Sequence, residues 1–111
     1  MPTPVAVLGG GSFGTCLAVL ASREHDVVLW ARDAQVVDGV NREHRNPRYL
    51  EDVALPERLR ASNDLGKVLA DAELVICAVP SHGVREVMTL AGQHLSREAV
   101  LVSTEIGRAH V

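Results

Sequence analysis

The sequence predicts an α/β fold, in which a doubly wound parallel sheet carries helices on both of its faces. Short runs of aliphatic residues alternate along the chain with longer stretches of helical character. This alternation is typical of a parallel sheet with right-handed crossovers. A glycine-rich turn joins the first strand-like run to the first helix-like run. The 111 residues, 47% of them hydrophobic, suffice for one domain with its own core.

The first strand is expected at residues 5–8, and a buried helix at residues 15–23. Between them Gly9, Gly11 and Gly14 follow the spacing G-x-G-x-x-G. Strand, turn and helix in this order are the fingerprint of a Rossmann-type dinucleotide site. Gly9 permits the tight turn, Gly11 lets a pyrophosphate approach the backbone, and Gly14 permits close packing of helix and strand. The helix N-terminus offers free N–H groups and a partial positive charge to the phosphates.

The second strand is expected at residues 27–30, after a turn in which His25 is a turn residue rather than a ligand. Arg32 and Asp33 follow this strand. At this place an acidic residue usually holds the adenosine ribose, whereas an arginine favours a 2′-phosphate. Asp33 also suits the N-cap of a helix expected at residues 34–41. We therefore assign Asp33 to the cap and contact with the cofactor to Arg32.

The rest of the chain continues the alternation, after a polar, proline-containing connection at residues 42–59. The sheet is expected to have the strand order 3-2-1-4-5. His82 follows the fourth strand, near the edge where ligands bind in such sheets, and we interpret it as a loop histidine in preference to a nicotinamide contact. The expected elements are an edge strand at 60–62, a helix at 65–70 capped by Asn63 or Asp64, a central strand at 74–79 buried on both faces, a helix at 83–91 with Ser81 as its cap, and a last strand at 99–103.

Composition argues against several other classes of protein. The net charge of −3 disfavours a nucleic-acid or membrane-surface role, and one residue each of Trp, Tyr and Phe offers no stacking platform for bases. No apolar run has the length of a membrane span, and no basic signal sequence precedes the first strand. Cys16 and Cys77 are interpreted as reduced core thiols of a cytoplasmic protein. The spacing of His, Cys, Ser and Asp residues indicates neither a metal site nor a catalytic triad.

Five segments together resemble the N-terminal domain of bacterial-type NAD(P)-dependent glycerol-3-phosphate dehydrogenases. The glycine turn alone is generic to dinucleotide enzymes, but its combination with the later segments in this order is much more specific. The resemblance covers residues 4–104. The segments are VAVLGGGSFGT (5–15), VVLWARD (27–33), NPRYL (46–50), the Leu55-Pro56 pair and LVICAVPSH (74–82).

The resemblance implies reversible hydride transfer between NAD or NADP and the pair sn-glycerol 3-phosphate and dihydroxyacetone phosphate, a reaction that supplies glycerophospholipid synthesis. The family's cofactor contacts fall on Ser12, Phe13 and Arg32, with Tyr49 as a weaker candidate. For the complete enzyme a homodimer is one assembly left open, since the sequence does not determine the oligomeric state. Phe13 replaces a frequent tryptophan, Cys16 replaces an alanine, and Glu24 replaces a glycine, none of which is expected to abolish the site.

The resemblance ends abruptly near residue 104. Residues 1–104 are therefore expected to be the NAD(P)-binding domain, and residues 105–111 a tail that is not native to the gene, with a genuine divergent end as the alternative. Glu105–Gly107 replaces a Thr-Lys-Gly segment whose lysine touches cofactor and substrate in the family. The helical substrate domain, which carries the catalytic lysine, lies outside this chain. We expect no catalytic residue here and no activity from the 111 residues alone.

Two other functions remain open on the sequence. One is a different nicotinamide-dependent reductase, such as a ketopantoate reductase or a hydroxyacid dehydrogenase, which the LWARD and NPRYL segments disfavour. The other is a non-catalytic module that senses the ratio of nicotinamide cofactors.

Overall fold

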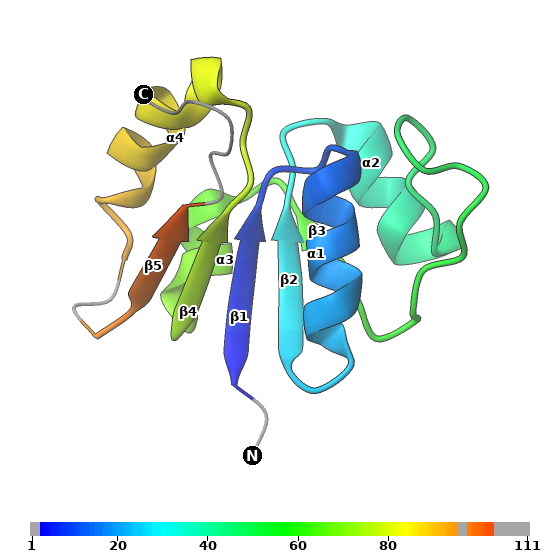
Figure 1. The fold of residues 1–111 in the computed structure, drawn as a ribbon, viewed down its shortest axis with the longest axis horizontal. Coiled ribbons are helices and arrows are strands. Elements are labelled where there is room, and N and C mark those ends of the chain that lie inside the picture. The colour runs from blue at the N-terminus through cyan, green and yellow to red at the C-terminus, as the bar shows by residue number, and fades with distance from the viewer. Residues whose placement is uncertain (1–2, 96–97, 104–111) are drawn as a thin grey trace, which may run out of the picture.

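A computed structural model, which describes residues 3–95 and 98–103, confirms the predicted doubly wound α/β fold (Figure 1). Five strands within this described part form one sheet in the predicted order β3-β2-β1-β4-β5. All four strand pairings are parallel, so the carboxyl ends of the strands share the upper edge in Figure 1. The strands are β1 (Pro4–Leu8), β2 (Asp26–Trp30), β3 (Arg60–Ser62), β4 (Leu74–Cys77) and β5 (Val100–Ser103).

Helices cover both faces of the sheet because the inner strands are apolar on both sides. In β1, Val5 and Val7 point into the core beneath α1 (Ser12–Ser22) and α2 (Ala34–Asp38). The alternating residues Ala6 and Leu8 point into the opposite core, beneath α3 (Leu65–Ala70) and α4 (Ser81–Ala91). A π-helical turn, η1 (Gly39–Glu43), continues α2. Figure 1 shows α1 in front of the sheet and α3 behind it.

Two helices begin earlier than the sequence predicts, and both begin at the edge that carries the site. Helix α1 begins at Ser12 rather than at residue 15, because Gly11 is extended and its carbonyl accepts the first helical hydrogen bond from the Thr15 N–H at 2.9 Å. Helix α4 begins at Ser81, with Pro80 at the N-cap position. The prediction that Ser81 caps this helix is therefore wrong, since extended Pro80 leads directly into the first turn.

Strand β4 is shorter and less buried than predicted. It ends at Cys77 rather than at residue 79, although it lies inside the sheet between β1 and β5, as predicted. Val75 and Cys77 are buried, whereas Leu74 and Ile76 are half-buried. The reason is visible in Figure 1, where α1 lies in front of the sheet beside β2 and leaves the front of β4 uncovered.

Several local predictions can be compared with the structure. Asp64 caps α3 by accepting a hydrogen bond from the Lys67 N–H at 3.1 Å, which decides between the two predicted caps. His25 lies in the turn before β2, and its Nδ1 accepts a hydrogen bond from the Thr3 N–H at 3.2 Å, as expected of a turn residue. Cys77 is buried as predicted, but Cys16 is exposed, because the inner face of α1 is formed by other residues.

Strand β5 lies at one edge of the sheet and all four of its residues are exposed. No helix among the described residues combines the length and the apolar character that a membrane crossing requires. The predicted tail at residues 105–111 lies outside the described residues, as does the side chain of His82, whose backbone lies in α4 rather than in a loop.

Candidate dinucleotide site

A cleft of about 410 Å³ opens at the carboxyl edge of the sheet. It lies where the connections that follow β1, β2 and β4 meet. The helices that follow the neighbouring strands β1 and β4 cover opposite faces of the sheet. Open α/β sheets bind ligands at such a switch point. The cleft is lined by Gly9, Gly10, Gly11, Trp30, Ala31, Arg32, Asp33, Val36, Tyr49, Val79, Pro80, Gly83, Glu86 and Val87.

The glycine turn forms one wall of this cleft, and each glycine of the motif has a separate reason to be glycine. Gly9 has a φ of +120°, which disfavours any residue with a side chain. A Cβ on Gly14 would collide with the carbonyl oxygen of Gly9, so the start of α1 packs directly against the turn. A Cβ on Gly11 would meet no protein atom within 4 Å, because Gly11 faces the open cleft.

The first turn of α1 follows Gly11 directly. Gly11 is the N-cap residue, with φ −74° and ψ −174°, and no side chain caps the helix. The first turn contains no acidic residue, so its free N–H groups and partial positive charge are not neutralised from within the helix. Ser12 and Phe13 are exposed in this turn, and Phe13 has an exposed fraction of 49%. An anionic ligand in the cleft would therefore find hydrogen-bond donors beside Gly11.

The connection after β2 supplies the charged wall. The guanidinium of Arg32 lies 5.7 Å from the centroid of the Trp30 ring, and its Nη2 lies 2.9 Å from Oε1 of Glu86 on α4. Both partners of this ion pair are more than half exposed, so the pair contributes little to stability. Arg32 thus stands at the cleft with its head group accessible, held between β2 and α4.

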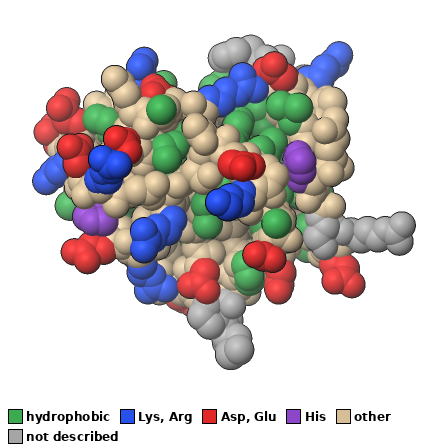
Figure 2. Space-filling model, turned by 180° about the vertical axis from the view of Figure 1, so that it is seen from behind, with side chains coloured by type: hydrophobic (Ala, Val, Ile, Leu, Met, Phe, Trp, Pro, Cys, Tyr) green, Lys and Arg blue, Asp and Glu red, His purple; other side chains and the backbone are tan. Residues whose placement is uncertain are grey.

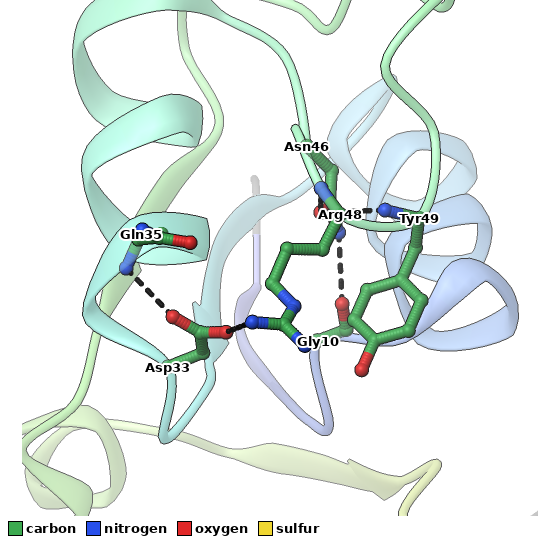
Figure 3. A network of polar contacts seen from close by, with 6 residues as sticks. All are labelled: Gly10, Asp33, Gln35, Asn46, Arg48 and Tyr49. Carbon is green, nitrogen blue, oxygen red and sulfur yellow. Dashed lines mark hydrogen bonds and ion pairs between the residues drawn. The ribbon is translucent and has the colours of Figure 1, made fainter.

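Asp33 is the N-cap of α2, as the sequence predicts. Its Oδ1 accepts a hydrogen bond from the Gln35 N–H at 2.8 Å. Its Oδ2 lies 3.1 Å from Nη1 of Arg48, a partner that the sequence does not indicate. Figure 3 shows the carboxylate between these two contacts.

Asn46 links the connection at residues 42–59 to the glycine turn, and sequence reasoning missed it. Its side chain is fully buried, and its Nδ2 donates to the Gly10 carbonyl at 2.8 Å (Figure 3). The same Nδ2 donates to Thr15 Oγ1 at 2.9 Å. Its Oδ1 accepts from the backbone N–H groups of Arg48 at 3.2 Å and Tyr49 at 3.3 Å. Asn-Pro indicates a turn here, but no sequence signal identifies a partner 36 residues away.

The structure brings most of the predicted site residues to one place. Gly9, Gly11, Arg32 and Tyr49 line the cleft, and Tyr49 is 52% exposed. Ser12, Phe13 and Gly14 form the first turn of α1, just outside the cleft lining. Contact of any of these residues with a cofactor remains a prediction.

Neither a patch of single-sign charge on the face in Figure 2 nor a metal-ligand cluster among the described residues adds to the site. In Figure 2, which shows the molecule from behind, acidic and basic side chains are interspersed on the visible face. Among the described residues, no three His, Cys, Asp or Glu side chains are grouped so that they could hold a metal ion.

Comparison with known proteins gives one consistent result. Residues 4–108 match the family described as NAD-dependent glycerol-3-phosphate dehydrogenase N-terminus. A glycerol-3-phosphate dehydrogenase (NAD(P)+) of Sphingopyxis alaskensis is 42% identical over 96% of this chain and 32% of its own length. The corresponding protein of Myxococcus xanthus is 46% identical over 92% of this chain and 31% of its own length.

A solved structure gives the same result in three dimensions. The glycerol-3-phosphate dehydrogenase of Coxiella burnetii superimposes with a TM-score of 0.87 and 34% sequence identity. The match covers 97% of this chain and 34% of that protein. The chain therefore spans about a third of the length of the relatives it matches.

Proposed function

Because the chain belongs to the NAD-dependent glycerol-3-phosphate dehydrogenase family and matches its N-terminal part, we propose that its cleft binds the pyrophosphate and adenosine of NAD or NADP. The prediction that the cofactor is NAD or NADP is confirmed at the level of the family. The placement of the dinucleotide in this cleft is our proposal, and the open face of Gly11 is the observation that carries it.

The residues of the cleft fit a dinucleotide. A pyrophosphate needs close approach to backbone N–H groups, and the space in front of Gly11 is free of protein atoms, whereas the positions around Gly9 and Gly14 are tightly filled. The first turn of α1 then supplies donors to the phosphate oxygens. Trp30, Val36 and Val87 provide apolar surface in the same cleft, as a ligand with a purine ring requires.

We assign the selection between NAD and NADP to Arg32. A guanidinium pairs bidentately with a phosphate, and the head group of Arg32 is accessible at the cleft. Glu86 already holds this guanidinium, so a 2′-phosphate would have to displace a carboxylate. We therefore expect Arg32 to support NADP binding in competition with Glu86. Tyr49, exposed at the same cleft, is proposed as a further contact.

For the whole protein we propose the reversible oxidation of sn-glycerol 3-phosphate to dihydroxyacetone phosphate. The nicotinamide ring, when bound, accepts or returns the hydride. The described residues contribute binding and orientation of the dinucleotide, and the groups that bind substrate and transfer its proton are proposed to lie in the remainder of the protein. A role in glycerophospholipid synthesis, a cytoplasmic location and a homodimeric assembly belong to the same proposal.

The two alternative functions differ in what they require. The family match disfavours a different nicotinamide-dependent reductase. A module that senses nicotinamide cofactors without turnover would bind NADH equally well, so binding alone does not separate it from the enzyme.

The proposal is tested by two measurements on the protein. Trp30 is the single tryptophan and lines the cleft, so its fluorescence should be quenched in a saturable manner by NADH. Full-length protein should then reduce NAD or NADP when sn-glycerol 3-phosphate is added. Absence of saturable NADH binding would refute the site, whereas binding without turnover in full-length protein would favour the sensing module.

A further inference from the structure

We propose that Asn46 is a positioning residue for the pyrophosphate, and that it acts by fixing the orientation of the Gly10–Gly11 peptide. This inference rests on the proposed dinucleotide function, and it adds a residue that touches neither the expected phosphates nor the nicotinamide. Asn46 acts through the turn, not on the ligand.

The side chain of Asn46 is saturated with hydrogen bonds inside the protein. An amide side chain has two N–H donors and one oxygen with two acceptor positions. The two donors contact the Gly10 carbonyl and Thr15 Oγ1, and the oxygen accepts from two backbone N–H groups of the following turn. The residue is fully buried. Loss of either half of this network would therefore leave buried polar groups without partners, which is costly.

The contact with Gly10 determines which way the next N–H points. In a trans peptide the carbonyl and the N–H of the same unit point in opposite directions. Asn46 holds the Gly10 carbonyl on the side of the loop, and Thr15 Oγ1 lies 3.4 Å from the same oxygen. The N–H of Gly11 is consequently directed away from Asn46. This N–H belongs to the residue that faces the open cleft.

Such external fixing is needed because the turn is built of glycines. Three consecutive glycines have access to many backbone conformations, and nothing in their own structure prevents the peptide between two of them from turning over. A turn that is already held in the binding conformation loses less entropy when the ligand binds. Asn46 supplies that constraint from a segment distant in sequence.

The oxygen of the Asn46 side chain holds the loop that brings Tyr49 to the cleft. Oδ1 accepts from the N–H groups of Arg48 and Tyr49 (Figure 3). These contacts set the turn from which Arg48 reaches Asp33 and Tyr49 reaches the cleft. One buried amide thereby connects the glycine turn, where the phosphates are proposed to bind, to the loop that carries Arg48 and Tyr49.

The variant Asn46→Asp separates the donor contact with the glycine turn from the acceptor contacts with the loop. A carboxylate still accepts from the loop N–H groups, but it cannot donate, and it repels the Gly10 carbonyl. The matched control is Arg48→Ala, which removes the ion pair with Asp33 from the same loop and leaves the Gly10 contact intact. Asn46→Ser, whose shorter, uncharged side chain does not reach the Gly10 carbonyl, provides a second variant.

The test compares a ligand with a pyrophosphate to one without. Dissociation constants of ADP-ribose and adenosine are measured by ligand-observed NMR, and that of NADH by Trp30 fluorescence, on the full chain and each variant. Near-UV circular dichroism and thermal melting establish that each variant is folded. We expect Asn46→Asp to weaken the binding of NADH and of ADP-ribose about tenfold, because the Gly11 N–H would lose its hydrogen bond to a phosphate. Adenosine affinity should change less than about twofold on the same argument.

The outcomes distinguish this inference from the proposed function. If the unaltered protein fails to bind NADH, the proposed function is refuted together with the inference. If it binds NADH but folded Asn46→Asp keeps the same ratio of ADP-ribose to adenosine affinity, only the inference is overturned. If Asn46→Asp does not fold, Asn46→Ser decides, because it also loses the Gly10 contact: a selective loss of ADP-ribose affinity supports the inference, and an unchanged ratio overturns it. Arg48→Ala should leave the ratio unchanged, and a loss as large as in Asn46→Asp would assign the effect to the loop alone.

Discussion

Replacement of Gly11 separates cofactor binding from folding more cleanly than any other substitution in the glycine turn. A Cβ at Gly11 meets no protein atom within 4 Å, and its backbone angles of −74° and −174° suit any residue. Gly11→Ala gains about 0.4–1 kcal/mol from reduced freedom of the unfolded chain. It loses up to about 1 kcal/mol because alanine is a poor N-cap. The free energy of unfolding should therefore change by less than about 1 kcal/mol.

The same methyl group occupies the space through which a phosphate would approach the Gly11 N–H. Loss of one hydrogen bond to a charged group costs about 1.5–3 kcal/mol, which corresponds to a roughly 10- to 150-fold larger dissociation constant. Gly11→Val, with a larger side chain, should lose at least as much. Urea denaturation measures the stability, and quenching of Trp30 fluorescence measures NADH binding. A folded Gly11→Val protein that binds NADH as tightly as its parent would refute the assignment of the site.

Further predictions concern the neighbouring residues and the chain as a whole. Arg32→Ala should weaken NADPH binding more than NADH binding in fluorescence titrations, and equal losses would exclude a role in selecting the 2′-phosphate. Gly14→Ala should destabilise the fold by about 1–3 kcal/mol in urea, because its Cβ collides with the Gly9 carbonyl; unchanged stability would contradict this packing. Asp33→Ala should cost about 1 kcal/mol through the lost cap of α2, whereas Asp33→Asn should retain the cap and cost less than about 1 kcal/mol. The 111 residues alone should show no reduction of NAD or NADP with sn-glycerol 3-phosphate in an absorbance assay, and measurable turnover would place catalytic groups within this chain.

Strand order and layer arrangement were predictable because they depend on local patterns. Buried strands of this sheet are short apolar runs, and the lengths between them permit helical crossovers. The start of α1 was not predictable in the same way. Residues 12–14 include a glycine and have weak helix propensity, yet the extended Gly11 and the packing of Gly14 on Gly9 begin the helix there.

The glycine turn of the site was predictable from the sequence, whereas the contacts that hold the rest of the cleft together were not. The spacing of the glycines identifies the phosphate wall, since each glycine answers a steric demand that is local to the turn. The contacts that hold the rest of the cleft together join distant parts of the chain. Asn46 contacts Gly10 across 36 residues, and Arg32 contacts Glu86 across 54. Contacts of this kind depend on where loops and side chains meet in the folded protein, which local spacing in the sequence does not indicate.

Binding of a dinucleotide at the carboxyl edge of the sheet can be tested by titrating isotope-labelled protein with NADH and following the backbone amides by NMR. NADH should cause saturable shifts concentrated at Gly11, Ser12 and Arg32, with smaller shifts near Tyr49. Shifts confined to the opposite edge, around Glu73, or no shifts at any NADH concentration, would contradict it.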